Sequence, residues 1–243
     1  MGSVDNNRED YVKVLKFSLS FIAVIAVLIL GLKLLDGFEQ TAVEQHSQNV
    51  IEKKLHQNSD VYAWLTVEGT RIDYPIAQHP LDDTYYLSHD IDGAETYYGA
   101  IFTELVNKKT FEDPVTIVYG HAMLDDSMFG SLDYFAKPAF FSEHASIKID
   151  TLTKHFEYEV LAAHSYTDDH IFHRFELGSQ EGLKYYIETL KTRTLQYGGS
   201  YRQITTSSQN DKFLILSTCD TFENEKRFVV TARLKNVKER TSK

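Results

Sequence analysis

About eight short apolar segments between residues 61 and 234 constrain most strongly what this chain can fold into. Each segment is a brief β-prone run or alternates apolar with polar residues, and polar turns separate them. After residue 60, helical periodicity appears at 131–141 and at 180–190, where Ser179 is the expected N-cap, so strands and helices do not alternate regularly. The pattern therefore favours a mainly antiparallel barrel or sandwich. The predicted strands are 61–67, 72–76, 99–102, 115–120, 147–152, 156–163, 213–216 and 227–234.

An uncharged apolar run from Phe17 to Leu32 precedes this region. Extended to 14–35 through the stems of the flanking lysines, a helix would measure roughly 33 Å, which is enough to cross a bilayer. A cleaved signal peptide and a core helix are less favoured, because no small-x-small site follows and the run is apolar on every side. Basic residues before the run favour a cytoplasmic N-terminus. We expect a single-pass protein of the cell membrane, with lipid around this helix and the main domain extracellular.

The charge, the cysteine content and the histidine spacing limit which partners, cross-links and metal sites the chain can have. The formal net charge of −10 excludes nucleic acid as a partner. A single cysteine excludes an intramolecular disulfide, so packing must stabilise the fold. His79 and His89 lie among acidic residues, but their spacing matches no known ligand motif, so we expect no metal and no cofactor.

The single cysteine follows the most apolar of the predicted strands. The strand 213–216 ends in Ser217 and Thr218, and Cys219 comes next. A side chain at the tip of a core strand is held rigidly and stays open to a ligand, which suits a nucleophile. The alternative is a small buried hydrophobic residue, because free cysteine is often buried.

Two further residues at strand ends could assist such a thiol. His121 follows the strand 115–120, and Arg227 opens the last strand. A thiol acting near neutral pH needs a base or cation nearby and donors for the oxyanion that it creates. Each residue also has a purely structural explanation. His121 could be a turn histidine, and Arg227 could be a solvated charge at the edge of the sheet. Arg233 lies on the same last strand, and we favour Arg227 because a hairpin after Cys219 brings the start of that strand closest.

Three segments together resemble the signature blocks of the sortases, and their order along the chain agrees. These segments are Tyr119–His121, Leu216–Cys219 and Arg227–Val230. The block 121–129 and the helix near residue 180 are similar to those of class B members. The resemblance extends over roughly residues 61–234.

The resemblance implies a mainly β fold: a closed antiparallel barrel of about eight strands, with N-terminal helices and one inserted helix before the catalytic strand. The expected organisation is a cytoplasmic N-terminus over 1–13, a transmembrane signal anchor over 14–35, a helical stalk or N-terminal helix over 36–58, a sortase-like catalytic barrel over 59–236 and a basic tail over 237–243.

The resemblance also implies a cysteine transpeptidase of Gram-positive cell surfaces. Cys219 would attack the threonine carbonyl of a sorting motif near the C-terminus of a surface protein or pilin, forming a thioacyl-enzyme. His121 would protonate the leaving amine and deprotonate the incoming one, while Arg227 would donate hydrogen bonds to the oxyanion. Ser217 and Thr218 would line the substrate groove. The acceptor amine would come from a peptidoglycan precursor or from a pilin lysine.

Two other functions remain open on the sequence. One is a membrane-tethered β-barrel binding module without enzymatic activity, in which Cys219 is a packed side chain. The other is a simple cysteine hydrolase, which differs from the transpeptidase only because water captures the acyl group.

Overall fold

The computed structural model describes residues 24–35, 49–54, 57–167, 169–203, 210–219 and 226–240. The chain separates into two compact units, Met1–Ser47 and Gln48–Lys243. In the first unit the described residues form a helix over 24–35. The second unit begins with a helix over 49–54, whose Ile51 is fully buried, and then holds all the strands described below.

The expected single-pass membrane location, which was based on an anchor at 14–35, is corrected by the described helices. Residues 14–23 lie outside the described residues, and residues 24–35 are helical. Within the described ranges, no helix is both long enough and apolar enough to cross a membrane. This finding contradicts the expected single-pass membrane location with an extracellular catalytic domain.

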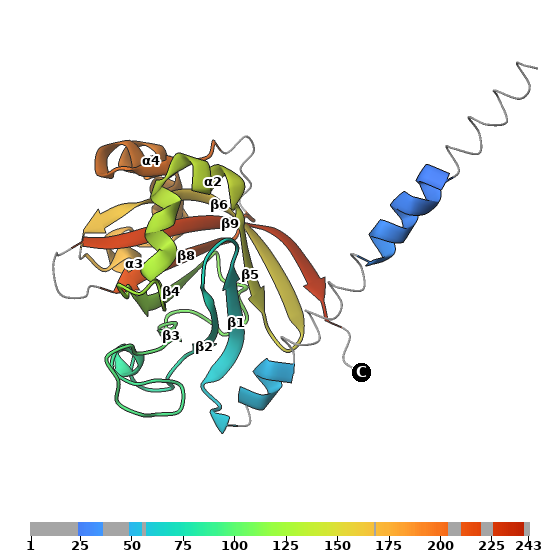
Figure 1. Cartoon of the computed structure of the whole chain (residues 1–243). Helices are drawn as coiled ribbons and strands as arrows, with labels where there is room; N and C mark the ends of the chain where they lie inside the picture. Colours follow the sequence, from blue (N-terminus) through green and yellow to red (C-terminus); the bar gives the residue numbers. More distant parts are fainter. Residues whose placement is uncertain are drawn as a thin grey trace, which may run out of the picture. The chain divides into compact units, whose positions relative to one another are not determined.

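Among the described residues of the second unit, nine strands form one sheet, and eight of them close into a barrel (Figure 1). Around the barrel the order is β5-β1-β2-β3-β4-β8-β9-β6, and β6 pairs again with β5, while β7 lies outside on β6. The elements are β1 (Val61–Val67), β2 (Asp73–Ala77), η1 (Tyr85–Leu87), β3 (Ile101–Phe102), β4 (Val115–His121), η2 (Gly130–Ala136), α2 (Pro138–Glu143), β5 (Ser146–Asp150), β6 (Lys154–Thr167), α3 (Ile171–Arg174), α4 (Gln180–Tyr197), β7 (Gly199–Tyr201), β8 (Phe213–Cys219) and β9 (Lys226–Glu239).

The expected closed, mainly antiparallel barrel is confirmed, with two pairs that run parallel. These pairs are β2 with β3 and β4 with β8. Parallel neighbours need a long crossover, and the chain provides one between β4 and β8, through β5, β6 and the helices α3 and α4. Three short elements, η1, α3 and β7, had no counterpart among the predicted elements.

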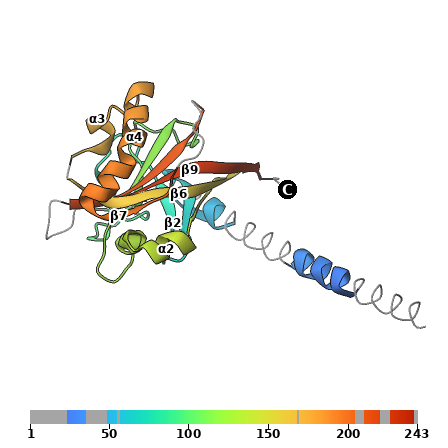
Figure 2. The ribbon, with the colours of Figure 1, turned by 90° about the horizontal axis from the view of Figure 1, so that it is seen from above.

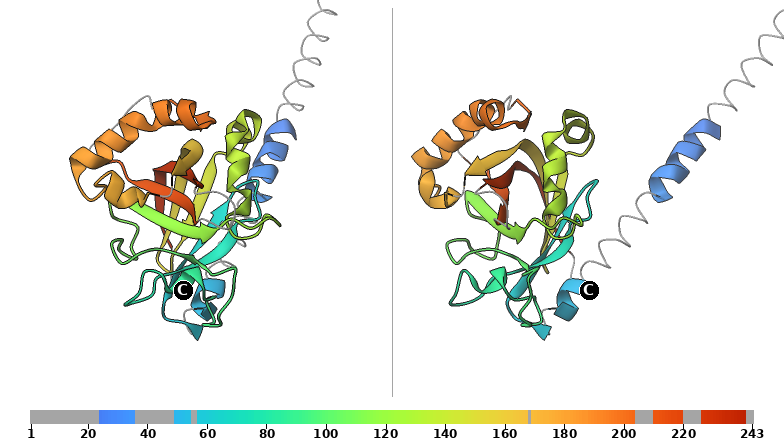
Figure 3. Two further views of the ribbon diagram at one scale, coloured as in Figure 1. Left: turned by 90° about the vertical axis from the view of Figure 1, so that its left-hand side faces the viewer. Right: turned by 60° about the vertical axis from the view of Figure 1, so that its left-hand side comes forward.

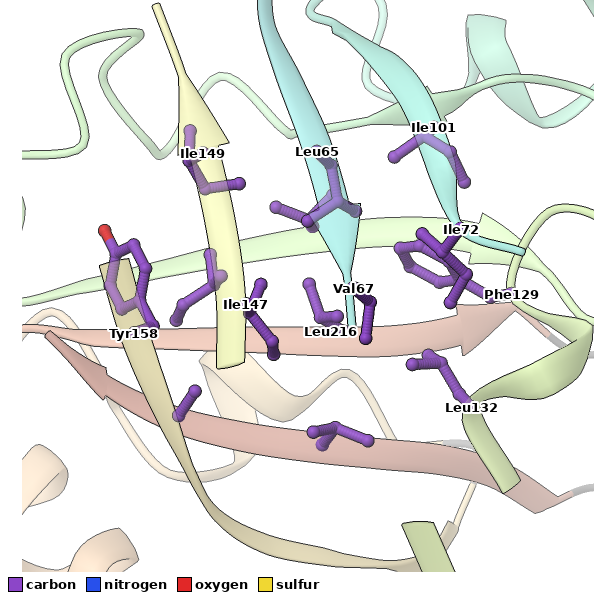
Figure 4. Packing of buried hydrophobic residues seen from close by; sticks show 14 of the residues in the cluster. Leu65, Val67, Ile72, Ile101, Phe129, Leu132, Ile147, Ile149, Tyr158 and Leu216 are labelled. Carbon is purple, nitrogen blue, oxygen red and sulfur yellow. The ribbon is translucent and has the colours of Figure 1, made fainter. Parts of the chain in front are cut away.

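The barrel wall is buried on both faces along β8. Leu214 and Leu216 join the cluster that fills the interior, part of which Figure 4 shows, whereas Phe213 and Ile215 join a second cluster outside the barrel. A strand covered on both sides must be apolar at consecutive positions. This double burial explains the uninterrupted apolar run before Ser217.

The helices α3 and α4 cover the outer cluster, on one side of the barrel (Figures 2 and 3). The Ser179 side chain accepts a hydrogen bond from the backbone N–H of Gly182 at 2.9 Å, so the expected N-cap is present. Tyr186 and Leu190 are fully buried, and the Tyr186 hydroxyl hydrogen-bonds Thr231 of β9 at 2.7 Å. This insertion is therefore fixed to the barrel wall by packing and by a buried hydrogen bond.

A buried ion pair fastens the end of β9 to the β5–β6 hairpin, and its removal should destabilise the fold. Arg240 Nη1 lies 2.8 Å from Asp150 Oδ1, and both side chains are less than 10% exposed. Arg240→Ala should lower the free energy of unfolding by about 1–3 kcal/mol, because the buried carboxylate of Asp150 then loses its cationic partner. Urea denaturation measures the change.

The matched control is Arg174→Ala, which breaks an ion pair with Asp169 whose side chains are 60% and 54% exposed. Exposed pairs contribute little, so this variant should stay within about 0.5 kcal/mol of the wild type. Equal losses in the two variants would contradict the structural role assigned to Arg240.

Candidate active site

Three neighbouring strands bring the predicted site positions to one end of the barrel wall. In the parallel pair of β4 and β8, His121 and Cys219 are Cα register partners. In the antiparallel pair of β8 and β9, Ser217 is the partner of Val229, and the same register continued by two residues brings Arg227 level with Cys219. His121 and Cys219 lie 98 positions apart along the chain, and strand pairing alone makes them neighbours.

The strand β4 can carry His121 to this position because the preceding residue is glycine. A Cβ on Gly120 would lie 2.3 Å from Ile101 Cδ1 and 3.0 Å from the Phe129 ring, both of which fill the barrel interior. Any larger side chain would push the interior packing away from β4. The interior packing therefore favours glycine at position 120, directly before His121.

The His121 ring is held by a backbone carbonyl on one side. Its Nε2 atom lies 2.7 Å from the Leu87 carbonyl oxygen. The Tyr97 ring lies nearly parallel to it, with 6.4 Å between the ring centroids and 17° between the planes. Nδ1 is buried and has no hydrogen-bond partner among the described residues. A ring held at one nitrogen with the other unengaged is suited to transferring a proton.

Arg227 lies on β9 beside buried, uncharged side chains. Its register partner on β6 is Tyr166, and the guanidinium Nε is buried without a hydrogen-bond partner among the described residues. Burial raises the pKa of the Tyr166 hydroxyl and lowers the pKa of the nearby His164 imidazole. Both neighbours therefore stay neutral near pH 7, and neither offsets the charge of Arg227.

The alternative arginine lies far from these positions. Arg233 is the register partner of Phe213, at the opposite end of β8 from Cys219, and it forms an ion pair with Asp211 at 3.7 Å. Six residues along a strand correspond to roughly 20 Å. Of the two arginines, Arg227 is therefore the one on the part of β9 near the Cys219 end of β8.

A pocket of about 320 Å³ lies beside Arg227 and Thr218. Phe228 and the loop residues after β4 contribute to its walls, and so does Asp133, whose carboxyl has a pKa raised by burial. The Thr218 side chain is 4% exposed and its Oγ1 accepts the backbone N–H of Phe228 at 2.8 Å, which ties β8 to β9. Ser217 is 1% exposed and is not among the residues that line this pocket.

His79 and His89, the pair considered for a metal, stack on Tyr85. Their ring centroids lie 4.4 Å and 4.1 Å from the tyrosine ring. The described part of the chain contains no group of three or more His, Cys, Asp or Glu side chains arranged to hold a metal ion. The geometry of this pair is that of an aromatic stack.

Sequence reasoning did not identify the residues that contact His121. Leu87 acts through its backbone carbonyl, which no side-chain pattern reveals, and it lies 34 residues away. Gly99 was assigned to a strand, whereas it has a φ of +58° just before β3. A glycine after two tyrosines is a weak local signal of such a conformation.

The chain matches the sortase domain model over residues 65–235. Sortase B of Listeria monocytogenes is 32% identical over 179 residues, which cover 73% of this chain and 70% of that protein. Sortase B of Staphylococcus aureus is 22% identical over 241 residues, which cover 88% of this chain and 96% of that protein.

Solved structures agree with the sequence matches. A Streptococcus pyogenes class B sortase involved in pilus biogenesis has a TM-score of 0.64 at 30% identity, covering 76% of this chain and 97% of that chain. A Bacillus anthracis sortase B has a TM-score of 0.64 at 29% identity, with coverages of 82% and 98%. The chain belongs to the sortase family, in its class B, whose members are cysteine transpeptidases.

Proposed function

We propose that this sortase cleaves a threonine-containing sorting motif through a thioacyl intermediate on Cys219 and transfers the acyl group to an amine. The observation that supports the proposal most directly is the register that sets His121 and Cys219 level on adjacent strands, with Arg227 on the next strand. Sulfur attack on the threonine carbonyl forms the C–S bond, and collapse of the tetrahedral intermediate breaks the peptide C–N bond. The released tail leaves as an amine.

In this proposal His121 and Arg227 have separate tasks. His121 gives a proton to the leaving amine in the first half-reaction and removes one from the incoming amine in the second. Arg227 donates hydrogen bonds to the oxyanion, since its guanidinium is always charged and its Nε has no partner among the described residues.

Substrate contacts and the acceptor belong to the same proposal. We assign Thr218 to the substrate groove because it lines the pocket beside Arg227, and Ser217 to the buried support of that groove. The motif would come from a surface protein or a pilin. The acceptor is a primary amine, from a peptidoglycan precursor or from a pilin lysine. The pilus role of the Streptococcus pyogenes relative supports keeping the second acceptor.

One incubation separates the three functions. The full chain is mixed with a fluorescent peptide that contains a threonine sorting motif, with and without triglycine or a lysine peptide, and the products are identified by mass spectrometry. An amide product supports the transpeptidase, while a free carboxylate with the amine present indicates a hydrolase. If neither forms and Cys219 resists alkylation until the protein unfolds, the chain is a binding module. Labelling of Cys219 in the folded state, with a pH dependence altered by His121→Ala, supports the enzyme.

The two arginines of β9 provide an internal comparison. Arg227→Ala should slow thioacyl formation by about 10²–10³-fold, the usual effect of removing an oxyanion donor. Arg233→Ala removes the same side chain at the far end of β8 and should stay close to wild-type rates. Rapid-quench mixing with the substrate peptide, followed by intact-protein mass spectrometry, measures the rate of thioacyl formation. A normal rate in Arg227→Ala with a loss in Arg233→Ala would reverse the assignment.

A further inference from the structure

The contacts of His121 distinguish its two ring nitrogens. Nε2 lies 2.7 Å from the carbonyl oxygen of Leu87. A carbonyl oxygen only accepts hydrogen bonds, so this distance requires a hydrogen on Nε2 in both the neutral and the charged ring. In the neutral ring the lone pair must then be on Nδ1, which is buried and has no hydrogen-bond partner among the described residues.

We propose that Leu87 and Gly99 together form a positioning device that holds His121 in the Nε2–H tautomer, so that Nδ1 is the atom that moves the proton during catalysis. Leu87 supplies the carbonyl, and Gly99 allows the carbonyl and the ring to approach. The inference rests on the function proposed above for His121.

The Leu87 carbonyl belongs to a rigid part of the chain. Leu87 ends η1, whose Tyr85 ring is stacked between His79 and His89. Tyr86 is 2% exposed, and its hydroxyl donates to Asp60 at 2.9 Å. Packing on both of the preceding residues thus fixes the direction of the Leu87 carbonyl. A fixed acceptor selects one tautomer and one ring orientation.

Gly99, at the other end of the segment 85–99, lies against the backbone oxygens of Tyr86 and Leu87 and the His121 ring. Its φ is +58°, and a Cβ there would lie 2.5 Å from the Tyr86 oxygen, 2.9 Å from the Leu87 oxygen and 3.0 Å from His121 Cδ2. A side chain at this position must move the carbonyl, the imidazole or both. Gly99 therefore determines how closely the hydrogen-bond acceptor can approach the ring.

The neutral character of the acceptor matters for the chemistry. A carboxylate partner would leave the protonated imidazole as half of an ion pair, whereas a carbonyl orients the ring and carries no net charge. The proton on Nδ1 then exchanges with the leaving and incoming amines without competition from a fixed partner among the described residues. Misplacing such a group by about 1 Å can cost on the order of 10²-fold in rate.

Nitrogen NMR tests the tautomer directly. The full chain is labelled with ¹⁵N-histidine, and the His121 signals are assigned by their loss in His121→Gln. In the neutral ring, Nε2 should show the shift of a protonated nitrogen and Nδ1 the shift of an unprotonated one. The reverse pattern, or an average of the two tautomers, would overturn the inference. This measurement does not depend on activity, so it remains decisive even if the proposed transpeptidation fails.

Two glycines of the same segment provide the functional comparison. Gly99→Ala should lower kcat by about 10-fold or more with little change in KM, shift the limb of the pH–rate profile that His121 governs, and alter the tautomer signals. Gly93 also has a positive φ, +81°, but a Cβ there meets only the Tyr85 hydroxyl at 3.7 Å. Gly93→Ala carries the same backbone strain and should keep the wild-type pH profile. A folded Gly99→Ala variant with wild-type kcat and pH profile would refute the role of Gly99.

Discussion

Cys219→Ala is expected to reduce both peptide cleavage and amide formation to the uncatalysed background, a loss on the order of 10⁴-fold or more. The chain has one cysteine, so the variant contains no thiol that could form a thioacyl bond. Intact-protein mass spectrometry after mixing with substrate peptide should show the acyl adduct on the wild type and none on the variant.

Cys219→Ser is the conservative companion of this variant. It keeps the size of the side chain, but a serine hydroxyl is a far weaker nucleophile than a thiolate without a strong base. Both variants should unfold at the wild-type temperature, since the buried residues 213–218 of β8 are unchanged in them. Cleavage that persists in Cys219→Ala would exclude the thioacyl mechanism.

His121→Ala is expected to lower the rate of amide formation by about 10²–10⁴-fold, the range of a general acid–base catalyst. The effect should be larger for transfer to the amine than for alkylation of Cys219, because transfer requires two proton movements. The limb of the wild-type pH–rate profile that reports the imidazole should disappear. Added imidazole should restore part of the rate by occupying the space that the ring vacates.

His173→Ala serves as the matched control for this variant. His173 is an exposed residue of α3, and the barrel strands that carry the site do not include it. This variant should retain wild-type rates and an unchanged pH profile. If both histidine variants lose activity equally, the loss reflects a general effect on the fold, and the assignment to His121 fails.

Much of the barrel was predictable because its strands carry local signals. The alternation in β1 and the apolar runs in β4 and β8 depend only on neighbouring residues, and the structure places strands at each of them. The same local logic led from the apolar run at 14–35 to a single-pass membrane location. That expectation is contradicted, because the described residues contain no helix with the length and apolar character needed to cross a membrane.

The choice between Arg227 and Arg233 is one that local sequence signals could not make. Both residues lie on β9, and the sequence offered only the shortness of the hairpin to separate them. The pairing of Phe213 with Arg233 shows that Arg233 lies at the opposite end of β8 from Cys219. One pair in an antiparallel register determines the partners of all the other residues along the two strands.

By itself the sequence determined which segments become the eight barrel strands, where the helix α4 begins, and which side chains follow strand ends, since these depend on residue type and spacing over a few positions. Only the tertiary structure decided that β4 and β8 run parallel, that His121 and Cys219 are level, and that the Leu87 carbonyl reaches the imidazole. Each of these facts joins residues more than 30 positions apart, so it depends on how the barrel closes. Closure is a property of the packed whole, and no local pattern encodes it.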